Sequence, residues 1–256
     1  MFSNIIEIII LSIVQGISEF LPISSSAHLN IIEIIFQFNS NSLMIDVSLH
    51  LGSLLAIIFY FRKELLDLKN NQKLLSLLII GSIPIVITGY IVSTTGLINL
   101  LENNLKIIAW TTLIFGIFLY IADKSKFDKK ISSDLNFKTI LYIGLFQILS
   151  LIPGVSRAGI TITAARFFKF NRFDSSKISF LLAIPAITGA SVLQLKNALE
   201  ESFEINYLIL ISIILSFLFS YFTVKYFLEY INKFSLNVFV IYRIIISIIL
   251  FIIIYN

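Results

Sequence analysis

Six long apolar stretches limit most strongly how this chain can fold. Each has between 17 and 20 residues and is bounded by charged residues or by Asn-rich turns. A helix needs roughly 20 apolar residues to cross a bilayer core about 30 Å thick. Charged residues make up only 13% of the chain, about half the share found in soluble domains. The sequence therefore predicts an all-α polytopic membrane protein with six transmembrane helices, over residues 45–61, 74–92, 105–122, 177–196, 205–224 and 237–255.

Two further apolar regions, residues 5–38 and 138–170, are each interrupted by a proline. Pro22 is followed by three serines after one residue, and Pro153 is followed by a glycine. The residue before a proline avoids the helical conformation, so each break ends one short helix and the next begins just after it. The halves are too short to cross the membrane comfortably. We expect two re-entrant helical hairpins, because non-helical backbone at membrane depth is tolerated only within protein or beside a wet cavity.

The two halves of the chain follow the same plan, a broken hairpin and then three spans. Three crossings are an odd number, so the second half is expected to lie upside down relative to the first. This plan is an inverted-topology repeat, which places sites near the midplane between the repeats. We interpret residues 1–256 as a single membrane domain, with repeat halves at approximately 1–122 and 138–256 joined by a basic loop at 123–137.

The basic residues are distributed unevenly between the two sides of this topology. If both termini lie on one side, the loops 62–73, 123–138, 169–177 and 225–236 lie on the other. By the positive-inside rule, these loops are cytoplasmic and both termini face outward. Basic residues in short loops between apolar spans also argue against a nucleic-acid partner. These loops contain 14 of the 19 basic residues: Arg62, Lys63, Lys69, Lys73, Lys124, Lys126, Lys129, Lys130, Lys138, Lys169, Arg172, Lys177, Lys225 and Lys233.

Several polar residues gather at the two breaks, at a depth where the membrane should exclude them. An ionisable side chain there costs at least about 2.5 kcal/mol and is by default a functional candidate. Gln15 and Glu19 are four residues apart and share a helix face. The serine triplet and His28 follow the first proline, and Arg157 follows the second. Because the chain has no cysteine, disulfides, thiolate nucleophiles and Cys-ligated metals are excluded.

The two breaks together predict an anion-binding site. Ser24 or Ser25 is a suitable N-cap for the helix after the first break, and Ser156 for the helix after the second. The free N–H groups and the dipole of a helix N-terminus favour phosphate, and Arg157 in the first turn can bind it with two nitrogens. Because the hairpins enter from opposite faces, we expect their tips to converge.

Each of these residues also has a plain structural interpretation. Serines in membrane helices often pack or bond to backbone carbonyls. In this interpretation Glu19 and Arg157 form a structural ion pair, and a lone histidine such as His50 is a packed core residue. Arg166 and Arg243 are expected to snorkel or to pair structurally. The combination of hydroxyl, carboxylate, imidazole and guanidinium at the two breaks favours the functional interpretation.

Two motifs carry these residues. Residues 15–28 read Gln-Gly-Ile-Ser-Glu-Phe-Leu-Pro-Ile-Ser-Ser-Ser-Ala-His, and residues 153–161 read Pro-Gly-Val-Ser-Arg-Ala-Gly-Ile-Thr. They resemble the two signatures of the undecaprenyl-diphosphate phosphatase family of the bacitracin-resistance type, and the stretch 46–54 is also similar. Ala27 stands where the family usually has glycine, and Ala158 where it usually has serine. The resemblance covers both halves and hence essentially the whole chain.

The resemblance implies a bacterial integral membrane enzyme that hydrolyses undecaprenyl diphosphate to undecaprenyl phosphate and inorganic phosphate. This reaction recycles the lipid carrier of peptidoglycan synthesis and confers bacitracin resistance. The resemblance also implies a site open to the outer face of the cytoplasmic membrane. It further implies a divalent cation, for which Glu19 and Gln15 are the candidate ligands of Mg²⁺ or Ca²⁺. By motif position, the implied catalytic residues are Glu19, Ser25, His28 and Arg157, and the implied phosphate-binding residues are Ser24, Ser26, Gly154, Ser156 and Thr161.

Two mechanisms and a second function stay open at this point. In the first mechanism Ser25 attacks phosphorus and forms a phosphoserine, with His28 on the same helix face as base or acid. In the second, Glu19 or His28 activates a water and Ser25 only holds phosphate. The alternative function is an inverted-repeat transporter or flippase of a polyprenyl phosphate lipid, because paired re-entrant tips also occur in transporters. A homodimer is open too, since the same apolar exterior suits lipid or a second copy.

Overall fold

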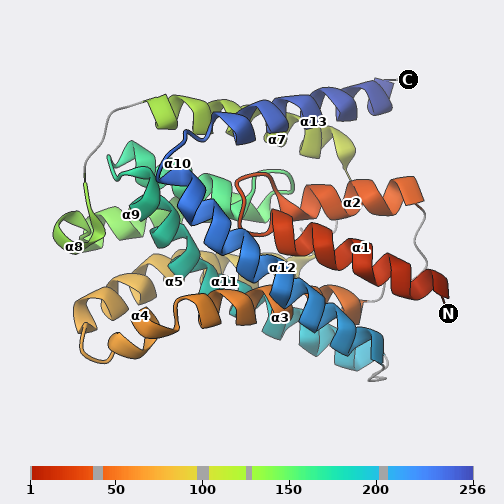
Figure 1. The fold of residues 1–256 in the computed structure, drawn as a ribbon, viewed down its shortest axis with the longest axis horizontal. Helices are drawn as coiled ribbons and strands as arrows, with labels where there is room; N and C mark the ends of the chain where they lie inside the picture. The colour runs from red at the N-terminus through yellow and green to blue at the C-terminus, as the bar shows by residue number, and fades with distance from the viewer. Residues whose placement is uncertain (1, 37–42, 97–103, 125–128, 202–206, 256) are drawn as a thin grey trace.

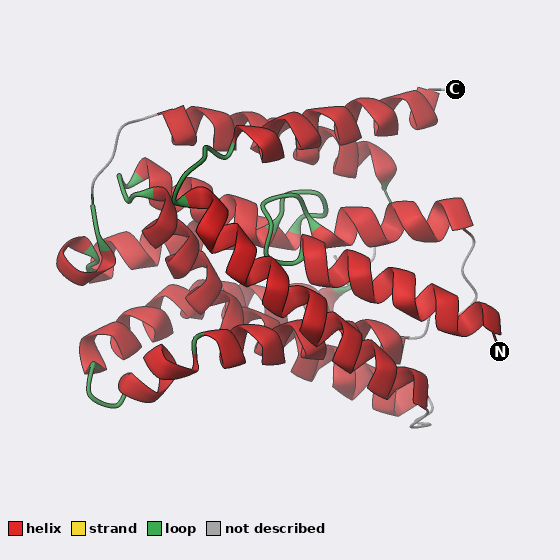
Figure 2. Ribbon diagram, viewed as in Figure 1, coloured by secondary structure: helices red, strands yellow, loops and turns green. Residues whose placement is uncertain are grey.

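The structure is a computed structural model, and all the regular elements that it describes are helical apart from one isolated bridge (Figure 2). Six described helices are long and apolar enough to cross a membrane, in agreement with the six predicted spans. They are α3 (Leu43–Tyr60), α5 (Gln72–Thr95), α7 (Leu105–Lys124), α11 (Arg172–Glu201), α12 (Tyr207–Ile231) and α13 (Asn237–Tyr255). The structure describes residues 2–36, 43–96, 104–124, 129–201 and 207–255.

Two of these helices extend by five residues or more beyond the apolar stretches that predicted them. α11 begins at Arg172 rather than at residue 177, and α12 continues to Ile231 rather than ending at residue 224. Asn171 explains the earlier start, because its side-chain oxygen accepts a hydrogen bond from Asp174 N at 2.8 Å and so acts as an N-cap. The expected start of the fifth span at residue 205 lies outside the described residues.

Shorter helices occupy the two interrupted regions, and the interruptions fall where the sequence predicts them. In the first region α1 (Phe2–Ser18) and α2 (Ser25–Phe36) lie side by side (Figure 1). In the second, α9 (Phe137–Gln147) leads through a 3₁₀ turn, η1 (Ile148–Leu151), to α10 (Arg157–Phe167). Two turns, residues 19–24 and 152–156, are therefore left without regular structure.

The chain termini and the basic loops lie at opposite ends of the molecule. α1 begins and α13 finishes at one end (Figure 1). Two short helices, α4 (Arg62–Asp67) and α8 (Ile131–Asp134), lie at the other end, within two of the basic loops. The expected linker 123–137 therefore contains a helix of one turn, and its residues 125–128 lie outside the described residues.

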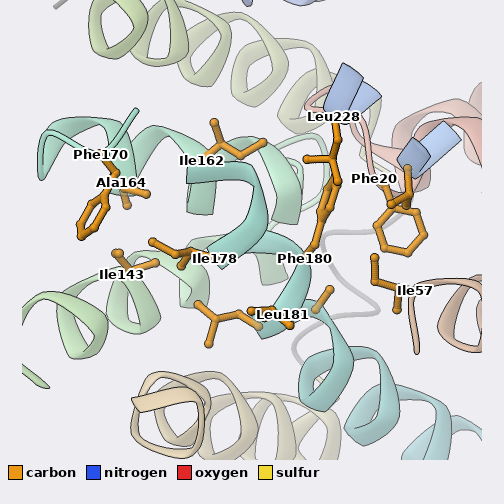
Figure 3. Packing of buried hydrophobic residues seen from close by; sticks show 14 of the residues in the cluster. Phe20, Ile57, Ile143, Ile162, Ala164, Phe170, Ile178, Phe180, Leu181 and Leu228 are labelled. Atoms are coloured by element: carbon orange, nitrogen blue, oxygen red, sulfur yellow. The ribbon is translucent and has the colours of Figure 1, made fainter. Parts of the chain in front are cut away.

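The largest apolar cluster of buried residues that the structure describes includes side chains of α10 and α11 and reaches the first turn. Ile162 on α10 and Leu181 on α11 are buried in it, and Phe180 packs edge-on against Phe20 with ring centroids 5.5 Å apart (Figure 3). Phe20 belongs to the first turn and has no exposed surface. The first turn is thus anchored to the core by the side chain that follows Glu19.

Small and polar side chains bring the spanning helices into close contact. On the α3–α12 contact, Ser53 Oγ lies 3.0 Å from Ser216 Oγ, and Ser216 Oγ donates to Leu49 O at 2.6 Å. A side chain at Gly52 would collide with the backbone carbonyl of Ile213. Apolar side chains gain little from leaving lipid, so membrane helices associate through such close packing and hydrogen bonds.

A buried carboxylate ties three helices and the turn before α13 together at the end that carries the basic loops. Asp123 on α7 accepts two hydrogen bonds from Arg172, at 2.7 and 3.0 Å, and one from Leu236 N at 3.0 Å. Its Oδ1 also lies 3.4 Å from Arg166 Nε on α10. Arg166 therefore pairs structurally, as the sequence suggested.

Two glycines make a testable contrast in helix packing. A Cβ at Gly144 on α9 would lie inside the contact distance of Gly81 O on α5, whereas a Cβ at Gly189 on α11 would meet no atom within 4 Å. We expect Gly144→Ala to lower the free energy of unfolding by about 1–3 kcal/mol through overpacking. Gly189→Ala should raise it by up to about 1 kcal/mol through helix propensity. Titration of the detergent-solubilised protein with SDS measures both, and equal effects would contradict the packing argument.

Candidate active site

The first turn leaves α1 at Ser18 and enters α2 at Ser25. Ser24 precedes the first residue of α2 and has a φ of 79°, a left-handed conformation that few residues other than glycine adopt. Its carbonyl accepts a hydrogen bond from His28 N at 3.4 Å, and its hydroxyl lies 3.3 Å from that of Ser26. Ser24 thus occupies the N-cap position that the sequence offered to Ser24 or Ser25, but its hydroxyl is bonded to a neighbouring serine.

The second turn ends in the cap that the sequence predicts. Ser156 Oγ accepts a hydrogen bond from Gly159 N at 3.0 Å, and Ser156 has a φ of 70°. Gly154 has a φ of 85°, and a Cβ there would collide with Thr111 on α7. The turn therefore needs glycine at this position for two reasons, its backbone conformation and its close approach to α7.

Arg243 on α13 holds both turns. Its guanidinium, which is 1% exposed, donates to Pro22 O of the first turn at 3.2 Å. It also donates to Val155 O and Gly154 O of the second turn, at 3.1 and 3.0 Å. Its Nε bonds to Thr112 O on α7 at 3.1 Å. Residues separated by more than 130 positions are brought together by this one side chain.

Glu19 is the point at which the two motifs meet. Its Oε1 lies 3.1 Å from Arg157 Nη2, and its Oε2 accepts a hydrogen bond from Ser25 Oγ at 2.8 Å. Gln15 Nε2 donates to the same Oε2 at 3.1 Å. The carboxylate is 7% exposed and the Arg157 side chain 12% exposed, so the pair is largely shielded from solvent. The pairing of Glu19 with Arg157, one of the two interpretations of the sequence, is present.

Arg157 is fixed by contacts from a neighbouring helix. Its Nη1 donates to Ser179 O on α11 at 3.4 Å, and its guanidinium lies 5.9 Å from the centre of the Phe20 ring. Thr161 Oγ1 donates to Ser179 Oγ at 2.6 Å. Thr161 therefore joins the first turn of α10, which carries Arg157, to α11. It does not lie next to Glu19. No local sequence pattern points to Ser179, because its contacts are set by tertiary packing.

The two histidines of the chain take places that differ from the sequence expectation. His28 is expected beside Ser25 on α2, but its Nδ1 lies 2.6 Å from Ser24 O and its Nε2 lies 2.6 Å from Tyr242 OH. His50, interpreted from the sequence as a core residue, has its Nε2 4.0 Å from Glu19 Oε2. The rotamers of His28 and His50 decide which groups the two imidazoles contact, and helix periodicity does not predict rotamers.

The donor atoms around Glu19 suit a hard cation better than a soft one. Among the described residues, no group of three His, Cys, Asp or Glu side chains is close enough to hold a metal. Gln15 Oε1 is buried and has no hydrogen-bond partner within the described part of the chain. The Gln15 amide faces Glu19 with its nitrogen, and turned over it would set an amide oxygen beside a carboxylate, an oxygen donor set of the kind that Mg²⁺ and Ca²⁺ prefer. Gln15 and Glu19 therefore fit a cation that takes its other ligands from phosphate.

Comparison with known protein families identifies the family of this chain. Residues 8–249 match the family model described as "Bacitracin resistance protein BacA". The chain belongs to the BacA family. The BacA match includes both turns, Arg157 and the residues of α13 up to residue 249.

Curated relatives of this BacA family chain share one printed name. An undecaprenyl-diphosphatase of Pelagibacter ubique (strain HTCC1062) is 90% identical over 256 residues, covering 100% of both chains. An undecaprenyl-diphosphatase of Elusimicrobium minutum is 38% identical, covering 96% of this chain and 97% of the relative. Undecaprenyl-diphosphatase 4 of Bacillus thuringiensis (strain Al Hakam) is 37% identical, covering 93% of each.

The buried ion pair of Glu19 and Arg157 can be tested by a double-mutant cycle. Arg157→Ala leaves a buried carboxylate without its guanidinium, and we expect it to lower the free energy of unfolding by about 3–5 kcal/mol. Glu19→Gln combined with Arg157→Ala should cost less than the sum of the two single changes, because the neutral amide needs no counter-charge. SDS titration of the three variants measures the coupling.

A partly exposed pair provides the matched control for this cycle. Lys177 Nζ lies 3.0 Å from Glu64 Oε1, with the side chains 23% and 37% exposed. Its cycle should give a coupling below about 1 kcal/mol. Equal couplings for the two pairs would show that burial does not strengthen the Glu19–Arg157 interaction.

Proposed function

We propose that the chain hydrolyses undecaprenyl diphosphate to undecaprenyl phosphate and inorganic phosphate. The observation that carries this proposal is the meeting of Ser25 and Arg157 on Glu19, from two motifs more than 130 residues apart. The name shared by the curated relatives supports the substrate. The reaction returns the lipid carrier to cell-wall synthesis, and this recycling confers bacitracin resistance.

The diphosphate binds where the two turns meet. Arg157 and the first N–H groups of α10 supply positive charge and hydrogen-bond donors for its nonbridging oxygens. The hydroxyls of Ser24 and Ser26 offer further donors at the start of α2, where Ser26 is exposed. Ser156 and Gly154 shape the turn that carries Arg157, and Thr161 supports it from within α10. Their part in phosphate binding is indirect.

Ser25 is the nucleophile in the proposed first step. Its hydroxyl already donates to Glu19 Oε2, so this carboxylate is in place to take the proton as the oxygen attacks the terminal phosphorus. The bond from Ser25 Oγ to phosphorus forms, and the bond from phosphorus to the bridging oxygen breaks. Undecaprenyl phosphate leaves with the bridging oxygen and with the proton that Glu19 took from Ser25, so Glu19 is a carboxylate again before the second step.

Water completes the reaction by attacking the phosphoserine and releasing inorganic phosphate. Glu19 takes a proton from this water as the water oxygen bonds to phosphorus. The bond from phosphorus to Ser25 Oγ breaks, and Glu19 passes the proton to Ser25 Oγ, which restores the hydroxyl. Arg157 stabilises the charge on the transferred phosphoryl group in both steps, because phosphoryl transfer depends mainly on positioning and electrostatics. The rival mechanism, in which water attacks the diphosphate directly and Ser25 only holds phosphate, uses the same residues.

Glu19 and the Gln15 carbonyl oxygen would hold a divalent cation, Mg²⁺ or Ca²⁺. When bound, it would neutralise charge on the diphosphate. Arg157 bonds to the Glu19 carboxylate through Oε1, and Gln15 donates Nε2 to Oε2, so a cation at Oε2 would require the Gln15 amide to turn over and present its oxygen. A cation held by one or two protein oxygens takes its other ligands from phosphate and water.

The two interrupted regions are proposed as re-entrant hairpins of an inverted repeat. Several helix contacts support this assignment, because they are reciprocal between the halves: α1 packs on α12, and α9 packs on α5. The first spans α3 and α11 contact each other, and so do the last spans α7 and α13. Gly16 and Gly144 lie at the two corresponding hairpin contacts.

The proposed orientation places both termini and the opening of the site on the outer side of the cytoplasmic membrane. The positive-inside rule supports it, since α4 and α8 mark basic loops at the end opposite the start of α1 (Figure 1). Many large apolar side chains on the spanning helices are exposed, as contact with lipid requires, and this surface also allows a homodimer.

Phosphate release from undecaprenyl diphosphate by the purified protein in detergent tests the activity. We expect release without any transbilayer gradient, and we expect Arg157→Ala to abolish it while the protein still inserts in the membrane. Detergent removes the two compartments that transport requires, so a transporter would release no phosphate. An absence of release from folded wild-type protein would overturn the proposed function.

Ser25→Ala separates the two mechanisms. The covalent mechanism predicts that kcat falls at least about a thousandfold, because a nucleophile is removed rather than a binding contact. Direct attack by water predicts a smaller fall in kcat and a rise in KM. Rapid-quench measurements with labelled substrate should find phosphoserine in the wild type. Substantial turnover by Ser25→Ala would exclude the covalent mechanism.

A chelator tests the cation. We expect EDTA to abolish phosphate release and added Mg²⁺ or Ca²⁺ to restore it. Gln15→Leu, which keeps the size of the side chain but removes the amide oxygen, should raise the cation concentration needed for half-maximal activity. The same half-maximal concentration in Gln15→Leu and wild type would show that Gln15 is not a ligand.

A further inference from the structure

The largest of the fully buried side chains described in the molecule is a charged one. Arg243 is 1% exposed, and its hydrogen bonds go only to backbone carbonyl oxygens. Within the described ranges, no carboxylate oxygen lies within 4.0 Å of its guanidinium. Burying a charge without a counter-ion is costly, and an apolar side chain would fill the same space more cheaply. The position therefore needs a guanidinium for a reason other than filling space.

The carbonyls that Arg243 binds show what it does. The three that belong to the turns come from Pro22, Gly154 and Val155, so both turns are held by one rigid, planar group. In a trans peptide the N–H points opposite to the C=O. Because Arg243 Nη1 holds the carbonyl of Val155, the N–H of Ser156 points away from Arg243. Arg243 thus sets the orientation of the backbone at the N-terminus of α10, directly before Arg157.

The residue before Arg243 contacts the other half of the site. Tyr242 OH lies 2.6 Å from His28 Nε2, and the two rings are stacked, with centroids 5.5 Å apart and planes 7° apart. Neighbouring residues on a helix point about 100° apart, so α13 reaches two different targets with two consecutive side chains. His28 is on α2, which carries the proposed nucleophile.

We propose that Tyr242 and Arg243 are positioning residues for the proposed hydrolysis, which this inference presupposes. Arg243 fixes the distance between the two turns and the orientation of the α10 N-terminus that bears Arg157. Tyr242 fixes the ring of His28 by accepting or donating at Nε2 while Ser24 O holds Nδ1. Both residues act through others, and α13 is the element that joins the nucleophile turn to the anion-binding turn.

Two variants and a matched control test the proposal. Tyr242→Phe keeps the stacked ring and removes only the hydroxyl, and Arg243→Lys keeps the charge but has fewer donors in a different shape. Ser247→Ala is the control, because Ser247 Oγ bonds Ala109 O at 2.9 Å and so joins α13 to α7 without touching either turn. For each variant we would measure kcat and KM by phosphate release, unfolding in SDS, and the imidazole ¹⁵N resonances.

The chain has only two histidines, so the imidazole resonances separate positioning from general stability. We expect Tyr242→Phe to shift the His28 Nε2 resonance and not that of His50, and to lower kcat about tenfold with KM within about twofold. Arg243→Lys should lower kcat/KM at least about a hundredfold per folded molecule. Ser247→Ala should stay within about twofold of wild type.

Four possible results bear on the proposal. If Tyr242→Phe leaves the His28 resonance and kcat unchanged, Tyr242 does not position His28. If the fall in the total activity of Arg243→Lys is no larger than its loss of folded protein, Arg243 is purely structural. If Arg243→Lys does not fold, Tyr242→Phe still decides the proposal. If folded wild type releases no phosphate, the proposed function fails, and the His28 resonance still tests the contact with Tyr242.

Discussion

Everything at the centre of this molecule depends on satisfying backbone carbonyls where two helices are broken inside an apolar protein. A non-helical turn exposes C=O and N–H groups that neither lipid nor hydrocarbon side chains can bond. Arg243 supplies donors to the carbonyls of both turns from one side chain. Because a guanidinium is planar and rigid, the bonds it makes also fix the distance between the turns. The cost of the breaks is thus offset by a group that gives the site its geometry.

A second consequence of the breaks is that two opposite charges, those of Glu19 and Arg157, are buried next to each other. A buried carboxylate and a buried guanidinium are each unfavourable alone, and their pairing at 3.1 Å makes the burial of both tolerable. In the proposed reaction the diphosphate competes with Glu19 for Arg157. The pair therefore keeps both groups ordered without substrate, and it can exchange one anion for another when substrate binds. A permanently bonded, purely structural pair would have no such competitor.

The sequence predicts much of this arrangement, and the reasons for its success and failure are physical. Apolar length predicts the six spans, and the serine before Arg157 predicts the cap on Gly159 N, since both depend on local sequence. The places of His28 and His50 depend on rotamers and on a tyrosine 214 residues away, which no local pattern contains. The sequence predicts only that Arg243 snorkels or pairs structurally. Its actual partners are backbone carbonyls, which every residue has, so no residue type in the sequence marks them.

The two turns are similar in backbone but differ in what their serines do, and this difference fits a division of labour. Ser24 and Ser156 both precede a helix with a φ near 70–80°, so the chain enters α2 and α10 in the same way. Only Ser156 uses its hydroxyl to cap its helix, which keeps the α10 turn closed around Arg157. Ser24 leaves that bond unmade, so Ser25 and Ser26 begin α2 with hydroxyls directed elsewhere, and Ser25 reaches Glu19. In the proposed reaction, the second turn thus holds the charge and the first presents the attacking oxygen, and the capping bond is one difference between them.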